Sequence, residues 1–369
     1  VQSKSELDRR IKQVWKKGYL QPVFFPSEPG DVDDDAFLPK LVIMHYDAEQ
    51  ASTEQDAPPE LVVRIFERAG SQEGFRRFKN NLVFLVADKQ QVDPMVDQVR
   101  RYLAIQRILG DPDRLGDFLE EQRSRLKKTG EAAELDVRVA ITRAYKWFYY
   151  PASDVPQSQS NLARVQLPAQ DQGEVTKDQS AVVMRMLQDL NKVQTSDAAP
   201  LAPQYVKARA WDAGQEKLTT EDLRKAFARK MSLRMMLDPN QLKKTIKFGI
   251  EQGVWIYFSA REQMGYSKAS PPPPIEISDD AYLYTPEAYE RTSWPIKGVT
   301  EPVIAPPGGD GGAGGEDIIL PPPITPPAVK PRLSGEGAPG QAFRRLQDMC
   351  DDNHVERVAF IDVSFDSQG

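Results

Sequence analysis

Residues 80–88 read Asn-Asn-Leu-Val-Phe-Leu-Val-Ala-Asp, a continuous apolar run that ends in an acid. Residues 39–47, Pro-Lys-Leu-Val-Ile-Met-His-Tyr-Asp, repeat this pattern. Short apolar runs without polar alternation are typical of strands buried on both faces, as in a parallel sheet covered by helices. Between the two runs, residues 59–69 place apolar side chains at helical spacing. The order strand, helix, strand predicts an α/β unit.

The segment after the second strand predicts a helical hairpin. Asp93 and Pro94 are the residue types favoured at a helix N-cap and at the first helical position. Two charged helices are then expected over residues 112–128 and 131–148, with a break at Thr129-Gly130 between them.

An aromatic run at residues 145–151, Tyr-Lys-Trp-Phe-Tyr-Tyr-Pro, would close this hairpin. Residues 151–178 are rich in Gln, Ser, Asp and Pro, so we expect a surface loop there. Residues 178–194 again carry apolar side chains on one side and predict a helix.

A second module is expected over residues 199–294. Thr219 to Asp222 have the spacing of a capping box, and Asp238-Pro239 marks another helix start. Apolar runs at 254–258 and 281–285 then predict two strands. Two helices followed by a two-stranded hairpin form the order of a winged-helix domain, with the long connection between the strands as the wing.

The end of the sequence predicts a linker and one further small domain. Residues 295–339 contain 11 prolines and 9 glycines, a composition that cannot bury a core. We therefore expect a disordered linker over 295–340 and a partial αβ domain over 341–369. Gly335, Gly337 and Gly340 fit G-x-G-x-x-G, but a preceding strand is missing, so chance in a glycine-rich stretch explains them.

Composition excludes several classes of protein. The single cysteine, Cys350, rules out an intrachain disulfide, and two histidines leave almost nothing for a zinc site. No apolar run is long enough to span a bilayer, so we expect no membrane contact and a cytoplasmic location. Asp31 to Asp35 resemble the start of a calcium loop but lack its glycine and glutamate. A solvated acidic loop is expected instead.

Two groups of cations are candidates for phosphate contact. Residues 216–268 hold 11 Lys/Arg against 6 Asp/Glu although the whole chain has a net charge of −6. Lys243, Lys244 and Lys247 lie on the helix that would enter the major groove; the alternatives are a solvated surface or a protein-binding face. Arg76 and Arg77 precede the second strand, where arginines can bind phosphate in cis or across a subunit interface. A plain charged loop is the alternative there.

Residues 77–88, Arg-Phe-Lys-Asn-Asn-Leu-Val-Phe-Leu-Val-Ala-Asp, and 99–104, Val-Arg-Arg-Tyr-Leu-Ala, carry a family resemblance. They resemble the stretch after the ATPase core in the domain-of-unknown-function-499 family of large bacterial AAA+-like proteins associated with phage defence. The resemblance covers residues 39–151. It implies a Walker-type ATPase in the full-length protein, with ATP and Mg as its cofactors.

The resemblance implies a division of the sequence. Residues 1–151 would be the C-terminal part of the ATPase core with its helical lid. The order of the expected elements, and not the resemblance, adds a loop and connecting helix at 152–198 and the winged-helix-like module at 199–294. Asn80 would be a sensor at the strand start, beside the phosphate contacts Arg76 and Arg77.

No G-x-x-x-x-G-K-[ST] motif occurs, so we do not expect this chain to hydrolyse ATP alone; we expect it to begin after that loop. Its function would be to couple an ATPase upstream to DNA or to other proteins of an anti-phage system, in a homo-oligomer. The alternative is a non-enzymatic interaction scaffold that contacts no nucleic acid.

Overall fold

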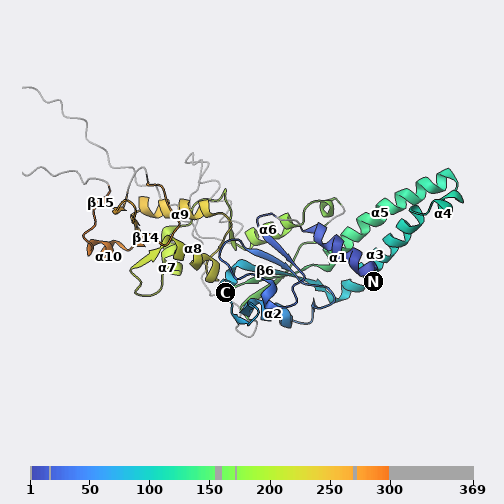
Figure 1. Ribbon diagram of the computed structural model, residues 1–369, viewed down its shortest axis with the longest axis horizontal. Helices are drawn as coiled ribbons and strands as arrows, with labels where there is room; N and C mark the ends of the chain where they lie inside the picture. Colours follow the sequence, from blue (N-terminus) through green and yellow to red (C-terminus); the bar gives the residue numbers. More distant parts are fainter. Residues whose placement is uncertain (1, 16–17, 154–159, 171–172, 269–271, 299–369) are drawn as a thin grey trace, which may run out of the picture. The chain divides into compact units, whose positions relative to one another are not determined.

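A mixed sheet around β6 (Leu82–Asp88) organises the N-terminal part of the chain (Figure 1). Its main strand order is β1-β2-β6-β7-β8, and the short β3 (Gln50–Ala51) also pairs with β6. β1 (Gln21–Phe24), β2 (Lys40–Ile43) and β6 run parallel. Every residue of β6 is buried. The two apolar runs are therefore confirmed as neighbouring parallel strands of a mixed α/β structure.

This computed structural model describes residues 2–15, 18–153, 160–170, 173–268 and 272–298. They belong to the first of two units, Val1–Val303. The structure does not describe the predicted C-terminal domain, the glycine motif or Cys350. It describes only residues 295–298 of the predicted linker. Within the described ranges, no helix combines the length and the hydrophobicity that a membrane crossing needs.

Helices cover both faces of the N-terminal sheet. The alternate β6 residues Val83 and Leu85 pack with one buried cluster, while Phe84 and Val86 pack with another. The second cluster includes α2 (Glu60–Glu67). The first includes four helices: α1 (Gln2–Val14), α3 (Lys89–Leu109), α5 (Glu120–Ala144) and α6 (Ser180–Asp189).

The predicted start of the helix after β6 was wrong. α3 begins at Lys89, directly after the strand, and Pro94 lies inside it. Proline removes one backbone hydrogen bond from a helix. Val92 and Met95 are nevertheless buried against the sheet, and this apolar burial holds the first turns in helical conformation.

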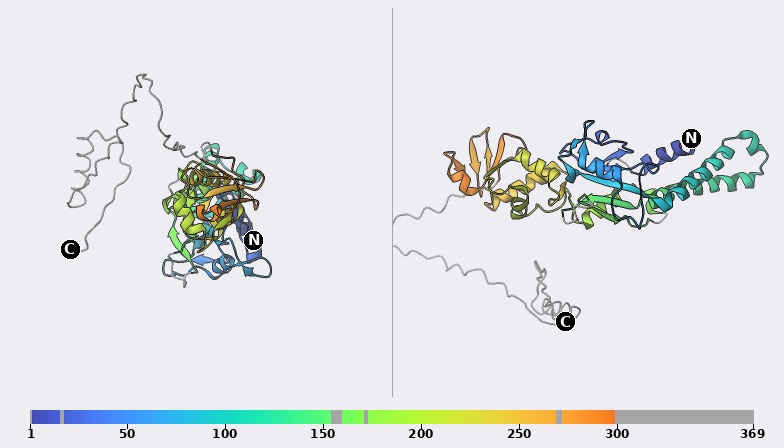
Figure 2. Two further views of the ribbon diagram at one scale, coloured as in Figure 1. Left: turned by 90° about the vertical axis from the view of Figure 1, so that its left-hand side faces the viewer. Right: turned by 90° about the horizontal axis from the view of Figure 1, so that it is seen from below.

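The predicted break at Thr129-Gly130 was also wrong. α5 continues through it, and only a short helix, α4 (Pro112–Gly116), lies between α3 and α5. Figure 2 shows α3 and α5 side by side as a hairpin. A Cβ atom at Gly130 would come within 3.0 Å of the Leu109 side chain. The glycine therefore permits close packing of the two helices.

The aromatic run is a strand and does not end a helix. β7 (Trp147–Pro151) pairs antiparallel with β6, and β8 (Leu162–Gln166) pairs antiparallel with β7. Part of the segment predicted as a surface loop is therefore a strand. Aromatic residues favour the pleated surface of a sheet, and three of the five β7 residues are aromatic rings with buried side chains.

A second sheet lies in residues 199–298. Three helices pack with one face of it around a buried cluster that includes Leu223, Ile246 and Leu283. The helices are α7 (Pro203–Ala210), α8 (Thr220–Arg229) and α9 (Pro239–Glu251). The strand order is β10 (Lys217–Thr219), β14 (Ala281–Tyr284), β12 (Ile256–Ser259), β13 (Met264–Tyr266) and β15 (Ile296–Lys297).

The predicted helix starts in this part are confirmed. The Thr219 hydroxyl accepts a hydrogen bond from the Asp222 amide at 2.9 Å, and the Asp238 carboxylate accepts one from the Asn240 amide at 2.8 Å. Both bonds satisfy amides that a helix N-terminus leaves free. Both predicted strands are present, and the long connection between them contains the additional strand β13.

Buried contacts join the two sheet-containing parts within the one unit. β9 (Val193–Gln194) pairs parallel with β11 (Met235–Met236). The Asn80 amide group donates to the Phe227 carbonyl at 2.7 Å and to the Leu233 carbonyl at 3.0 Å. Met235 and Leu237 belong to the same buried cluster as β6. The two sheet-containing parts therefore share a hydrophobic core, although the sequence predicts a domain boundary between residues 198 and 199.

Candidate functional site

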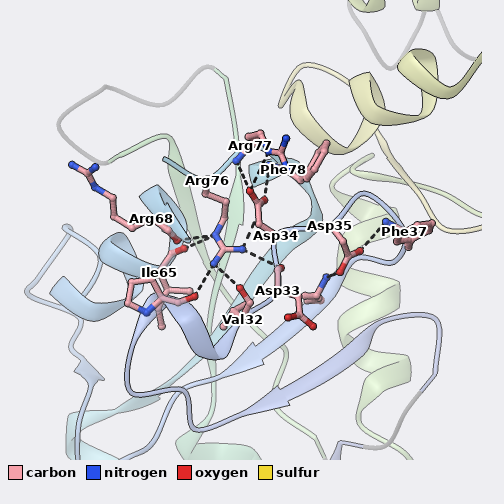
Figure 3. Close-up of polar contacts among 12 residues, drawn as sticks. Val32, Asp33, Asp34, Asp35, Phe37, Ile65, Arg68, Arg76, Arg77 and Phe78 are labelled. Atoms are coloured by element: carbon pink, nitrogen blue, oxygen red, sulfur yellow. Dashed lines mark hydrogen bonds and ion pairs between the residues drawn. The ribbon is translucent and has the colours of Figure 1, made fainter. Parts of the chain in front are cut away.

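Arg76 is enclosed by backbone carbonyl groups (Figure 3). Its guanidinium group donates hydrogen bonds of 2.8 to 3.2 Å to five of them, and its side chain has no exposed surface. The acceptors are the carbonyls of Pro29, Val32, Asp33, Ile65 and Arg68. Burial lowers the pKa of Arg76, and the neighbouring aspartates oppose that effect.

This arrangement corrects the expected position of Arg76. A phosphate contact needs guanidinium N–H groups that face the ligand, and here those groups face carbonyl oxygens within the chain. Arg76 instead fixes residues 29–33 against α2 and against the short strand β4 (Arg68–Ala69) that follows it.

Three of the four carboxylates in the acidic loop, residues 31–35, accept hydrogen bonds within the chain, whereas Asp33 is exposed. Asp34 accepts hydrogen bonds from the amides of Arg77 at 2.9 Å and Phe78 at 3.0 Å. Asp35 accepts one from the ammonium group of Lys40 at 2.6 Å. Across the described residues, no cluster of His, Cys, Asp and Glu has an arrangement suited to a metal ion.

Arg77 and Asn80 have opposite environments. The Arg77 side chain is 75% exposed, and its Nε atom lies 3.8 Å from Asp34. Asn80 is fully buried, and its amide bonds hold α8 rather than face solvent. Among the three residues expected beside a nucleotide, Arg77 is the one that presents its charge to solvent.

Asp8 and Asp47 engage both ring nitrogens of His45. The Asp47 amide donates to His45 Nδ1 at 3.1 Å, so the neutral ring carries its proton on Nε2. That nitrogen lies 3.4 Å from an Asp8 carboxylate oxygen. Contacts within the chain therefore account for both ring nitrogens of His45.

The three lysines of α9 lie on one solvent-facing side of the helix, which we call the lysine stripe (Lys243, Lys244 and Lys247). Lys244 is exposed, and Lys243 and Lys247 are half-buried. The adjoining buried side of α9, with Leu242, Ile246 and Ile250, is in the core. Positions 243 and 247 are one turn apart, so their ammonium groups share a face.

Residues 196–201 form one border of the lysine stripe, and the sequence alone does not predict this contact. Residues 196–201 run beside α9, where Gln241 donates to the Ala198 carbonyl at 2.7 Å. The Lys244 ammonium group donates to the Ser196 carbonyl at 3.0 Å. This segment contacts α9 through backbone carbonyls and the Leu201 amide, which leave no residue-type signal in the sequence.

Comparison of the chain with protein-family models, curated proteins and solved structures found no match.

Proposed function

We propose that this chain is the coupling portion of a large P-loop ATPase of a bacterial anti-phage system. It would couple the hydrolysis of ATP, with Mg as the metal cofactor, to DNA binding. The observation that carries the proposal is the lysine stripe on α9. Three cations on one solvent-facing side of a helix suit the phosphates beside a DNA groove.

The arrangement around α9 supports a winged-helix interpretation of residues 199–294. Helices α7, α8 and α9 pack on one face of β10, β14 and β12, and β14 pairs with both other strands. In this proposal α9 enters the major groove, and the connection that contains β13 is the wing.

The N-terminal part would be the segment of the ATPase core with its helical lid. The mixed sheet supports the core, and the hairpin of α3 and α5 supports the lid. Arg77, with its exposed charge, is the proposed contact to a nucleotide phosphate or a neighbouring subunit. Asn80 and the pairing of β9 with β11 would transmit movement to the lysine-bearing module, because they connect the two parts through buried bonds.

The test is DNA binding by the full chain as a function of salt. Replacement of Lys243, Lys244 and Lys247 by glutamine should weaken binding to duplex DNA. Each lost phosphate contact reduces the log–log salt slope by about 0.9, so three contacts reduce it by about 2.7.

A matched control removes three charges elsewhere. Arg125, Lys127 and Lys128 on α5 are all exposed, and their replacement by glutamine should leave the affinity and the salt slope unchanged. Equal losses in both triple variants would indicate a general charge effect and would contradict a site on α9.

The alternative is a protein-interaction scaffold without nucleic-acid contact. The bond from Lys244 to the Ser196 carbonyl favours it, because one of the three cations already has a partner in the chain. Absence of salt-sensitive DNA binding by the full chain at low ionic strength would support this alternative.

A further inference from the structure

The face of the second sheet that points away from α7, α8 and α9 is unusually aromatic. Along β12 and β14, Tyr257 and Leu283 belong to the core with the helices, so the alternate residues face the other way. Those residues include Phe258, Tyr282 and Tyr284. Tyr289 from α10 (Pro286–Glu290) and Trp294 complete what we call the aromatic face.

Phe258 lies at the centre of the aromatic face. Its ring centroid is 6.4 Å from that of Tyr282, 6.2 Å from Tyr284, 6.4 Å from Tyr289 and 5.4 Å from Trp294. A Cβ atom at Gly265 would overlap the Tyr289 ring. The central rings are therefore closely packed, and Phe258 and Tyr289 are buried.

The surrounding rings remain accessible. Trp294 is 44% exposed, and Tyr282 and Tyr284 are half-buried. Among the residues that the structure describes, the hydroxyls of both tyrosines and the indole N–H of Trp294 have no hydrogen-bond partner. The face thus offers apolar ring surface together with three groups that can donate hydrogen bonds.

The charges beside this surface do not suit a polyanion. Lys217 lies 5.5 Å from the Tyr282 ring centroid, and Arg291 pairs with Glu216 at 2.5 Å. Glu287 and Glu290 on α10 are exposed. Lys217 also lies 6.0 Å from the Tyr284 ring centroid, and Lys207 acts on Glu287. The cations and carboxylates around the rings therefore nearly balance and give no net attraction for phosphates, while the exposed Glu287 and Glu290 can still pair with a basic group on a ligand.

We propose that the aromatic face binds a proline-rich peptide segment of a partner protein, with a basic residue at one end. Proline has no amide N–H, and a polyproline II helix has no internal hydrogen bonds, so its carbonyls are free to accept. Tyrosine and tryptophan rings that carry outward donors match this combination of apolar ring and free carbonyl. Glu287 and Glu290 provide the partners for the basic end.

The experiment measures fluorescence anisotropy of a labelled synthetic peptide with the sequence of residues 320–332, Leu-Pro-Pro-Pro-Ile-Thr-Pro-Pro-Ala-Val-Lys-Pro-Arg. This peptide stands in for the partner's segment, and the protein is the full chain with serine at positions 321, 322, 323, 326 and 327, so that its own prolines cannot compete with the probe. We expect saturable binding, and no binding of a peptide whose prolines are serines.

Two variants locate the site. Trp294→Ala removes an exposed ring, and Tyr282→Thr with Tyr284→Thr keeps residues that favour strands. Each should weaken peptide binding about tenfold or more, as expected for an aromatic anchor. Tyr19→Ala, which removes a ring that is 63% exposed elsewhere, should leave binding unchanged. Circular dichroism of each variant verifies its fold.

Two results would overturn the proposal. One is absence of peptide binding, or binding that the aromatic-face variants do not change. The other is binding of a single-stranded oligothymidine that depends on Trp294 and weakens steeply with salt, which would assign the face to nucleic acid. Neither result depends on the lysine stripe, so this test is separate from the test of DNA binding by α9.

Discussion

Arg76 and the lysines of α9 carry the same charge but differ in what surrounds them. Five backbone carbonyls accept hydrogen bonds from Arg76. Within the lysine stripe, Lys244 alone among the described residues donates a hydrogen bond to a backbone carbonyl, that of Ser196. A cation that has satisfied its donors inside the chain holds the fold together, whereas a cation that faces water remains available to a ligand. Charge in a sequence therefore predicts function only after internal acceptors have been counted.

The largest effect expected from this difference is that of Arg76→Met on stability. The replacement leaves five carbonyls without their donor in a buried site, and loss of one partner of a buried charged group costs about 3–5 kcal/mol. Urea denaturation should show this loss in the free energy of unfolding. Arg77→Met is the matched control, and its effect should stay within about 0.5 kcal/mol because the Arg77 side chain is 75% exposed. Equal effects of the two variants would refute the structural role of Arg76.

A smaller effect is expected from Asn80→Ala. The change leaves the Phe227 and Leu233 carbonyls without the Asn80 amide group, at a cost of about 1–3 kcal/mol. Because these bonds join the two sheet-containing parts, native-state hydrogen exchange should quicken in α8 more than in α5. An unchanged exchange pattern would show that Asn80 does not hold this junction.

The smallest effect on stability is expected from the glutamine replacements at Lys243, Lys244 and Lys247. Each side chain lies at the surface of α9, and glutamine has a helix propensity close to that of lysine. The free energy of unfolding should change by no more than about 0.5 kcal/mol per position. A loss as large as that of Arg76→Met would erase the contrast between the two groups of cations.

The sequence predicts those features that depend on local pattern. The buried strands β2 and β6 follow from apolar runs, and the starts of α8 and α9 follow from Thr219 and Asp238. β7 was missed because its aromatic run directly follows a long helical pattern and was assigned to the end of that helix. Its pairing with β6 joins segments far apart in the sequence, which no local pattern encodes.

The candidate site residues also divide into those that local sequence pattern predicts and those that depend on distant contacts. The common face of the α9 lysines follows from helical spacing. Arg76 and Arg77 are adjacent, and sequence alone treats them alike; their separation into a buried and an exposed cation depends on carbonyls more than forty residues away. Asn80 likewise contacts α8 across a separation that no local pattern encodes. The aromatic face was also missed, because its rings come from separate strands and α10.

The pairing of β9 with β11 has a consequence for the order in which the chain acquires its structure during synthesis. Met235 and Leu237 complete the same buried cluster that surrounds Val83 and Leu85. A nascent chain that ends near residue 199 lacks these side chains, so part of its apolar surface stays open to water until β11 emerges. The N-terminal sheet thus finishes folding only when later residues arrive, and truncation at that point is expected to yield aggregating protein.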